Sequence, residues 1–430
     1  MKNILIIVDS HNDLDHALPL IFYLNKRKDI ELTVVATSIK MVNSCNDFVR
    51  YLNKELNVKV HDINQILAPL YVPFIKTYIS MQKSCSKHKS NPFYLPILFL
   101  ISILRPLILL FSRRSLVRLF SHFKPSYIMM DFGKEITIHG RNILYHSRLL
   151  NIPVIGYLHG YSVYTNKDPL VKDKSDIGRV KKAIVQMIKD HRKRTYCDCY
   201  LVGVNQKNTY FSTSMMGNYE SSELHRVYEL GLPRYCREWI KIYRDKIVSS
   251  VFNHGDTRKV NVVLFLSHPK YNVNLTQLYD TINLLSKIET INFIFKPHPR
   301  VELDGVNIGK ESMLSVSYAS SIQLSEWADI GIVFGSSIAF QLLLDKVALI
   351  VPSYLHSNRT IFEKNNVCIS VDNEVELEKT LRLTLGDINN LLDQSLIDEF
   401  IDKIIYGGCK SFSALMDEYF SKLINCKVTK

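Results

Sequence analysis

Short runs rich in Ile and Val alternate with helical stretches along the whole chain, and this alternation constrains the fold more than any other feature. Strands separated by helices form β-α-β units, whose strands pair in parallel. A chain of 430 residues is long enough for two or three domains. The pattern therefore predicts an α/β protein with two Rossmann-like domains that face a cleft. The predicted strands of the first half are 3–8, 31–37, 126–130, 152–157 and 198–203. A strand with a sharp turn follows at 227–235, and the strands of the second half are 261–267, 291–296, 330–334 and 347–351.

The alternation is interrupted by an irregular stretch at 205–226, rich in Asn, Ser, Thr and Tyr, and it restarts at 259. We place the domain boundary in this stretch. The expected units are an N-terminal domain at 1–215, a C-terminal domain at 216–395 and a helical, amphipathic C-terminal segment at 396–430.

The charge balance indicates an anionic partner. The chain carries 54 Lys and Arg against 41 Asp and Glu, a net charge of +13. Such a bias favours a phosphate, a nucleotide, a nucleic acid or a membrane surface, and a merely soluble basic surface is the alternative. A nucleic acid is the weakest candidate, because the chain has no basic strand with interleaved aromatic residues and no known reading helix. We therefore expect no nucleic-acid partner.

The cysteines and the N-terminus predict a cytoplasmic protein. The eight cysteines have no regular framework, and the C-x-C at Cys197 and Cys199 has no second pair at zinc spacing. They are typical of thiols in a reducing compartment. The N-terminal sequence reaches Asp9 too early for a signal peptide. We expect no metal site and no cofactor.

An apolar segment suggests contact with a membrane. Residues 92–111 are almost all apolar and are followed by Arg113, Arg114 and Arg118. Pro96, Arg105 and Pro106 interrupt the segment, which argues against a helix that spans a bilayer. We expect 92–118 to touch the cytoplasmic face of the membrane, with the arginines at the lipid phosphates. A buried helical hairpin is the alternative.

A basic motif follows the predicted strand 291–296. It reads Lys296, Pro297, His298, Pro299 and Arg300. The two prolines deny the chain a helix and hold the imidazole at the strand tip. Three basic side chains within five residues form a compact receptor for an anion. We therefore predict that Lys296, His298 and Arg300 bind a phosphate.

Gly335, Ser336 and Ser337 stand at a predicted strand-to-helix junction. The glycine allows close approach of the backbone, and the N–H groups of a helix N-terminus attract anions. An ordinary serine N-cap is the alternative. His268, at the end of another strand, and Glu326, as a contact to ribose, complete the predicted donor site.

The N-terminal half offers several candidates for a general base. His159 follows the strand 152–157 and precedes a glycine, and imidazole titrates near neutral pH. The competing candidates are Asp131, at the end of the strand 126–130, and a group in the first loop that comprises Asp13, Asp15 and His16.

These motifs resemble a family. His159-Gly160, the basic-Pro-His-Pro element at 296–299 and the Ser336-Ser337 turn are similar to motifs of the GT-B-fold transferases that build bacterial surface polysaccharides. The chain resembles in particular the CDP-glycerol glycerophosphotransferases and the capsule or sialic-acid-type transferases that use CMP-sugars. The turn at 230–234 resembles the start of the C-terminal half in such enzymes. The Asp-Tyr that precedes the serine pair in glycerophosphotransferases is missing.

The resemblance implies a metal-independent transfer from a nucleotide-activated donor, with a cytidine nucleotide as the first choice, to a glycan or lipid-linked acceptor. His298 and the serine pair would hold the donor phosphates, and His159 would be the base. Two rivals remain: a nucleotide-sugar 2-epimerase of the same fold, and a basic membrane-associated scaffold without catalysis.

Overall fold

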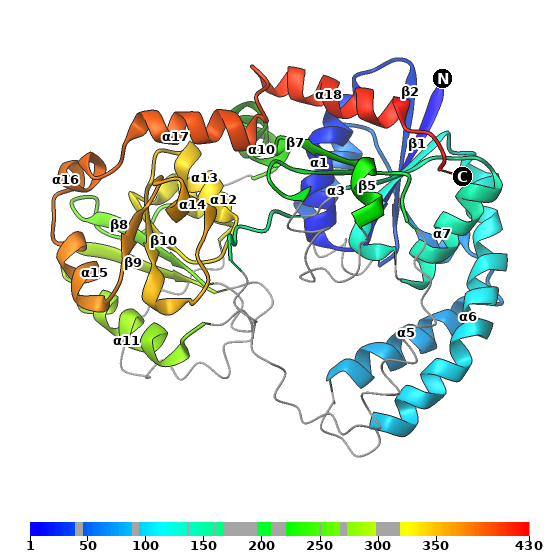
Figure 1. Cartoon of the computed structure of the whole chain (residues 1–430), viewed down its shortest axis with the longest axis horizontal. Coiled ribbons are helices and arrows are strands. Elements are labelled where there is room, and N and C mark those ends of the chain that lie inside the picture. The colour runs from blue at the N-terminus through cyan, green and yellow to red at the C-terminus, as the bar shows by residue number, and fades with distance from the viewer. Residues whose placement is uncertain are drawn as a thin grey trace.

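Two parallel sheets form the framework of the protein (Figure 1). The computed structural model describes residues 1–38, 46–87, 94–135, 137–157, 160–166, 196–207, 221–248, 252–266, 273–297 and 319–429. The sheets lie in two separate α/β domains, and helices complete each domain. The predicted fold class is therefore confirmed.

The first sheet has seven strands in the order β3-β2-β1-β4-β5-β6-β7. Neighbouring strands are parallel throughout. The order in which the chain lays down its strands reverses between β1 and β4, which makes this the topological switch point of the domain. The strands are β1 (Lys2–Val8), β2 (Ile30–Ala36), β3 (Val60–Asp62), β4 (Tyr127–Asp131), β5 (Val154–Tyr157), β6 (Cys199–Gly203) and β7 (Val227–Leu230).

Helices cover both faces of this sheet because its strands are apolar on both sides. Alternate residues of a strand point to opposite faces. Ile4 and Ile6 of β1 pack in one buried cluster with Leu18 of α1, whereas Leu5 packs in another with Ile143 of α7. The helices are α1 (His11–Asn25), α3 (Asn46–Lys54), α4 (Ile63–Ile66), α5 (Val72–Lys87), α6 (Tyr94–Phe123) and α7 (Ile138–Leu149).

The second sheet has five strands in the order β12-β11-β10-β8-β9, again all parallel. Its switch point lies between β8 and β10. The strands are β8 (Val260–Phe265), β9 (Ile291–Lys296), β10 (Ile330–Val333), β11 (Ala348–Pro352) and β12 (Ile369–Val371). The helices of this domain are α11 (Leu275–Ser286), α12 (Ser321–Trp327), α13 (Ile338–Leu344), α14 (Ile361–Lys364), α15 (Glu374–Leu381) and α16 (Leu385–Asn390).

The end of the chain returns to the first domain. After α17 (Gln394–Phe400) and a π-helical turn, α18 (Phe412–Asn425) contacts α1, β7 and α10 (Arg237–Lys246). The Tyr127 hydroxyl donates to the Ile424 carbonyl at 3.0 Å, and both termini lie on this side of the molecule (Figure 1). The first sheet also extends past the expected limit at residue 215, because β7 pairs with β6. The chain thus changes sheet between Leu230 and Val260.

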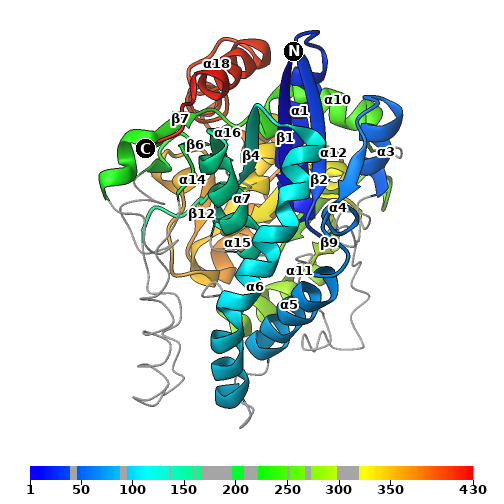
Figure 2. The same cartoon turned by 90° about the vertical axis from the view of Figure 1, so that its right-hand side faces the viewer.

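Helices α5 and α6 form a hairpin that projects from the first domain (Figure 2). The Tyr78 hydroxyl of α5 donates to the Ile101 carbonyl of α6 at 3.1 Å. At the base of the hairpin, Asn142 and His146 of α7 hydrogen-bond the carbonyls of Leu109 and Arg113. Among the described residues, no helix has both the length and the apolarity to cross a membrane.

The close approach of two backbones at Gly231 gives a test of this domain arrangement. A Cβ at Gly231 would lie 2.3 Å from the Ile405 carbonyl oxygen, which cannot move without the π-helical turn. We expect Gly231→Ala to destabilise the protein by about 2–4 kcal/mol. Thermal unfolding followed by circular dichroism would show a melting temperature several degrees lower. Gly386→Ala is the control, since a Cβ there meets only the Thr384 hydroxyl at 3.8 Å; an equal loss in both variants would refute the prediction.

Candidate functional site

Ligands of open parallel sheets bind beyond the carboxyl ends of the strands, at the switch points. In this protein the two carboxyl edges meet. The segment that follows β5 contacts residues that follow β10 and β11. The candidate site therefore comprises the switch point of the first sheet, the switch point of the second sheet and the segment between them.

Asp13 lies at the first switch point, and its carboxylate is hydrogen-bonded to other residues of the same loop. Asp13 is 1% exposed. Its carboxylate accepts hydrogen bonds from the backbone N–H groups of Asp9 and Ser10, at 2.9 and 3.1 Å, and from the Ser10 hydroxyl at 2.8 Å. The bond from the Ser10 N–H, together with a bond of 3.3 Å that the Asp13 N–H donates to the Ser10 hydroxyl, makes the N-terminal capping box of α1. Asp13 thus organises the loop, and its role as a base stays a prediction.

A partly buried charge cluster surrounds Lys134, next to Asp13. The Lys134 ammonium lies 2.8 Å from Asp9 Oδ2, and Asp131 accepts a hydrogen bond from the Gly133 N–H at 2.9 Å. Burial opposes the positive charge, but attraction to Asp9, Asp13 and Asp131 outweighs it and raises the pKa of Lys134. The sequence analysis found Asp131 but not Asp9 or Lys134, because Lys134 comes from a helical turn 125 residues after Asp9.

His139 is a second residue that the sequence analysis missed. It stands in the first turn of α7 and is 8% exposed. Burial lowers the pKa of its imidazole to about 4, although Asp9 attracts the proton. Its Nδ1 has no hydrogen-bond partner within the described part of the chain. His139 is therefore neutral at pH 7, beside the charge cluster.

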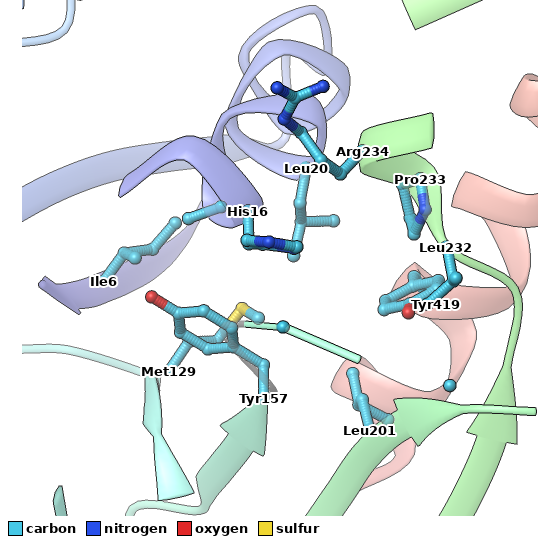
Figure 3. Close-up of a pocket in the computed structure, with 13 residues that line it drawn as sticks. Ile6, His16, Leu20, Met129, Tyr157, Leu201, Leu232, Pro233, Arg234 and Tyr419 are labelled. Atoms are coloured by element: carbon cyan, nitrogen blue, oxygen red, sulfur yellow. The ribbon is translucent and has the colours of Figure 1, made fainter. Parts of the chain in front are cut away.

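A small pocket of about 40 Å³ opens between α1 and the strands of the first sheet (Figure 3). His16 lies in it, and Tyr157, whose hydroxyl donates to the Asp13 carbonyl at 3.1 Å, forms part of its wall. Gly160, the residue after His159, also lines the pocket. The pocket thus brings His16 of the first-loop group together with Gly160.

Asp15, the third member of the first-loop group, forms an ion pair. Its Oδ1 lies 2.6 Å from Nε of Arg234, a residue that is 7% exposed. Burial opposes the charge of the guanidinium, but Asp15 outweighs this effect and the pKa of Arg234 is raised. The pair ties α1 to the turn at 230–234 that the resemblance singled out.

The second switch point carries Gly335, Ser336 and Ser337 directly after β10. Gly335 has a φ of +63°, which a residue with a side chain rarely adopts. The Ser337 hydroxyl accepts a hydrogen bond from the Tyr235 hydroxyl at 3.0 Å. Lys296 ends β9 at the same edge, and burial lowers the pKa of its ammonium. The structure describes no hydrogen bond or ion pair of that ammonium.

Residues 160–166 form a strap between the domains. At its first half, the Tyr161 hydroxyl donates to the Val204 carbonyl at 2.8 Å. At its second half, Thr165 N–H donates to the Arg359 carbonyl at 2.9 Å, next to an antiparallel bridge between Tyr164 and Thr360. The strap therefore fixes the exit of β5 to the second domain.

Tyr164 lies against the Gly335 turn. Its ring stacks on His356, with centroids 5.0 Å apart, and its hydroxyl lies 3.3 Å from His356 Nε2 and 3.5 Å from the Gly335 carbonyl oxygen. His356 is 4% exposed, and its Nδ1 accepts the Asn358 N–H at 3.0 Å. A Cβ at Gly335 would lie 2.1 Å from the Tyr164 hydroxyl, so only glycine fits. No sequence signal could pair Tyr164 with His356, 192 residues later.

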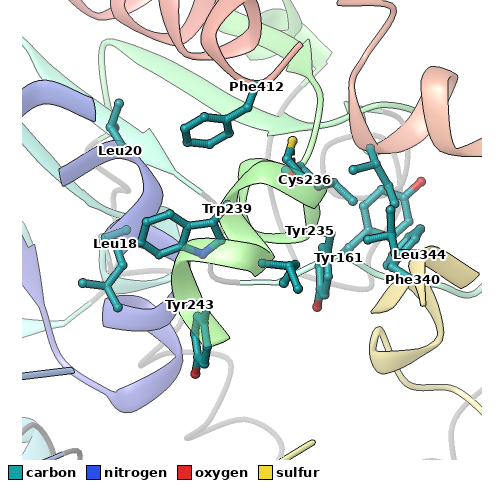
Figure 4. Close-up of a cluster of buried hydrophobic side chains, with 14 of the residues drawn as sticks. Leu18, Leu20, Tyr161, Tyr235, Cys236, Trp239, Tyr243, Phe340, Leu344 and Phe412 are labelled. Carbon is teal, nitrogen blue, oxygen red and sulfur yellow. Dashed lines mark hydrogen bonds between the residues drawn. The ribbon is translucent and has the colours of Figure 1, made fainter. Parts of the chain in front are cut away.

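An aromatic cluster joins the domains behind this site (Figure 4). Phe340 of α13 packs edge-on against Tyr161 at 5.1 Å and at a tilt against Tyr235 at 5.3 Å. Trp239 of α10 is fully buried between α1 and α18 and stacks with Phe412. This cluster supports the strap and the Ser337 turn from within.

Several predicted residues remain to be placed. His159, His268, His298 and Arg300 lie outside the described residues. Glu326 lies 3.5 Å from Arg244, which also pairs with Asp345 at 2.7 Å, and its contact to ribose stays a prediction. In the described ranges, no three His, Cys, Asp or Glu side chains form a group that could hold a metal ion.

Solved structures show the same overall fold. No protein-family model matches the sequence, and no curated protein matches it either. A UDP-GlcNAc 2-epimerase from Neisseria meningitidis bound to UDP-GlcNAc is similar with a TM-score of 0.58 and 12% identity, over 99% of this chain and 100% of that chain. A putative UDP-N-acetylglucosamine 2-epimerase from Listeria monocytogenes gives 0.53 and 10%, over 98% and 96%. The glycosyltransferase of kitacinnamycin gives 0.52 and 11%, over 98% and 99%.

These similarities define the class of fold. All three extend over nearly the whole of both chains, so they relate the complete two-domain arrangement rather than one Rossmann-like unit. The chain has the GT-B architecture, as the resemblance implied.

The neutral, buried His139 gives a pH-dependent prediction. The unfolded chain takes up this proton near pH 6.5, whereas the folded protein does so only near pH 4. Between these values the unfolded state binds more protons, so stability falls as the pH falls. This histidine alone should cost about 2 kcal/mol between pH 7.5 and pH 5.

The change in melting temperature between pH 7.5 and pH 5 measures this effect. We expect it to be clearly smaller in His139→Gln than in the wild type. His225→Gln, at an exposed position, is the control and should keep the wild-type difference. An unchanged difference in His139→Gln would contradict the prediction.

Proposed function

We propose that the protein is a GT-B transferase that moves a sugar, or a polyol phosphate, from a nucleotide-activated donor to an acceptor of a bacterial surface polysaccharide. The acceptor is a glycan or lipid-linked glycan of the capsule, lipopolysaccharide or teichoic type. A cytidine nucleotide is the first choice of donor. The reaction needs no metal and no cofactor, and it takes place in the cytoplasm, at the inner face of the membrane.

One observation carries the proposal. The half-buried Lys296 ammonium and the Gly335–Ser337 turn lie at the carboxyl edge of the second sheet, where the strap from the first domain reaches it. Such an edge is where open α/β sheets hold their ligands, and an ammonium, glycine backbone and hydroxyls suit a phosphate. The comparisons support it, because the glycosyltransferase of kitacinnamycin has the same two-domain fold.

In the proposed reaction, the acceptor hydroxyl attacks the donor and loses its proton to His159. His298, Lys296, Arg300 and the turn at Ser337 stabilise the charge that develops on the leaving phosphate. His268 and Glu326 complete the donor site. Tyr164, on the strap that follows His159, contributes its hydroxyl to the phosphates at the Gly335 turn.

A 2-epimerase is the second candidate, and the two UDP-GlcNAc 2-epimerases among the similar structures favour it. An epimerase changes its nucleotide-sugar without an acceptor. Incubation of the protein with UDP-GlcNAc alone, followed by NMR of the sugar ring, distinguishes the two functions. Inversion at C2 would replace the transferase proposal by the epimerase.

Thermal unfolding with CMP, CDP, UDP, GDP and ADP tests the donor site. A nucleotide at 100 times its dissociation constant stabilises the folded protein by about 2.7 kcal/mol. We expect one base to protect the wild type and to lose most of this effect in His298→Ala and Lys296→Ala. Lys379→Ala, an exposed lysine of α15, removes the same charge and should be protected like the wild type. If no nucleotide protects the wild type, the scaffold becomes the better explanation.

Loss of one hydroxyl tests the strap. Tyr164→Phe keeps the stacked ring but removes the group beside the Gly335 turn. Because a hydrogen bond to a charged group is among the stronger ones, we expect affinity for the protecting nucleotide to fall about 10-fold by titration calorimetry. Tyr161→Phe makes the same change on the same strap, where the hydroxyl bonds Val204 instead, and should keep its affinity. Equal affinities of the two variants would remove Tyr164 from the site.

A further inference from the structure

One face of α6 is apolar and open to solvent. Phe99, Leu100, Ile103, Leu107 and Leu110 form this apolar stripe, and they are 41% to 58% exposed. At about 100° per residue they fall on one side of the helix. The opposite side is buried against α5 and the domain, and it includes Ile101 and Ile108, each 6% exposed. These exposed fractions show that no described segment of the chain covers the apolar stripe.

The same face continues with positive charge. Arg114 and Arg118 follow the apolar stripe on the same side of the helix, and both are exposed. Between them Val117 is 51% exposed. The face therefore changes from five apolar side chains to two guanidinium groups within about one helical turn.

The whole hairpin region is free of acidic residues. From Ile63 to Met130 the sequence has nine Lys and Arg and no Asp or Glu. The rest of the chain has 45 Lys and Arg against 41 Asp and Glu. Nine of the 13 net positive charges thus lie in this region, which includes α5 and α6.

This combination selects the partner. An apolar surface of this kind favours a non-aqueous environment, and exposed arginines at its end favour phosphate groups. A second copy of the chain would bring two positive surfaces together with no acidic side chain in either. A nucleic acid would leave the apolar stripe in water. We infer that the apolar stripe and its two arginines are a docking surface for the headgroup region of an anionic lipid bilayer.

The hairpin places this surface on the side of the candidate site. Helix α6 is about 45 Å long, whereas β4, which follows it directly, is about 17 Å long. Because the C-terminal end of α6 joins the amino end of β4, its N-terminal half extends past the carboxyl edge of the sheet (Figure 1). The N-terminal half of α6 and the pocket near His16 thus both lie toward the carboxyl edge of the first sheet, although α6 and α1 pack on opposite faces of it.

Co-sedimentation with vesicles tests the inference on the full chain. We expect the wild type to bind vesicles of phosphatidylglycerol and phosphatidylcholine (30:70) and to bind pure phosphatidylcholine much more weakly. Ile103→Ser with Leu107→Ser should lower the partition coefficient on the order of 100-fold. Arg114→Ala with Arg118→Ala should lower it about 25-fold on the anionic vesicles only.

Two matched double variants control for hydrophobicity and charge. Val375→Ser with Leu391→Ser removes exposed apolar side chains of the second domain, which are 76% and 56% exposed. Lys379→Ala with Lys403→Ala removes two exposed charges outside the hairpin. Both should bind vesicles like the wild type. Melting curves check that each variant is folded. We expect all of them to fold, because the replaced side chains are exposed.

Three outcomes would overturn the inference: a wild type that binds no vesicles, α6 variants that bind as the wild type does, and controls that lose binding equally. Gel filtration identifies the rival occupant. If the wild type is a dimer that Ile103→Ser with Leu107→Ser converts to a monomer, with vesicle binding unchanged, a second copy covers the face. The measurement uses no nucleotide and no turnover. Its failure would remove the membrane contact from the proposed function but would leave the proposed transfer reaction intact, and failure of the nucleotide tests would leave vesicle binding intact.

Discussion

Parallel pairing of the strands is the constraint on which the rest of this structure depends. A parallel sheet must be covered on both faces, and its connections bring every carboxyl end to one edge. In the first domain this edge collects Asp9, Asp13 and Asp131, and in the second it collects Lys296 and the Gly335 turn. Polar groups that follow different strands are far apart in the sequence, but they become neighbours because parallel strands all end at the same edge.

The strap is the consequence with the greatest bearing on function. The carboxyl edges of the two sheets face each other. A segment that leaves the first sheet after β5 can therefore reach the carboxyl edge of the second sheet in a few residues, and residues 160–166 do so. The second domain then determines where the segment after His159 lies, since Thr165 and Tyr164 are bound to that domain. A donor bound at the Gly335 turn, as proposed, would meet Tyr164 on the strap that leaves the first domain. The two halves of the proposed reaction are thereby coupled through the backbone.

Local patterns predicted the strands well because the apolar runs of a parallel sheet are continuous and short. The strands near 3–8, 291–296 and 330–334 appear close to the expected limits. Contacts between distant segments could not be predicted, since neither the Lys134–Asp9 pair nor the Tyr164–His356 stack has a spacing that identifies it. The boundary at 215 shows the same limit: a strand is expected near 227–235, but no local pattern identifies β6 of the first sheet as its partner.

The net positive charge is concentrated in one region of the chain, and this affects which anionic partner it indicates. A net charge of +13 for the whole chain favours a phosphate-binding protein, but outside residues 63–130 the excess of basic residues is small. Nine of the 13 net positive charges therefore lie at 63–130, whereas acidic and basic groups are mixed at the switch points. A donor phosphate depends on a few placed groups such as Lys296, whereas a lipid surface responds to the field of a whole helix face. The two proposed anionic partners would thus bind to different segments. The donor phosphate would bind near Lys296, and the lipid surface would bind to helix α6.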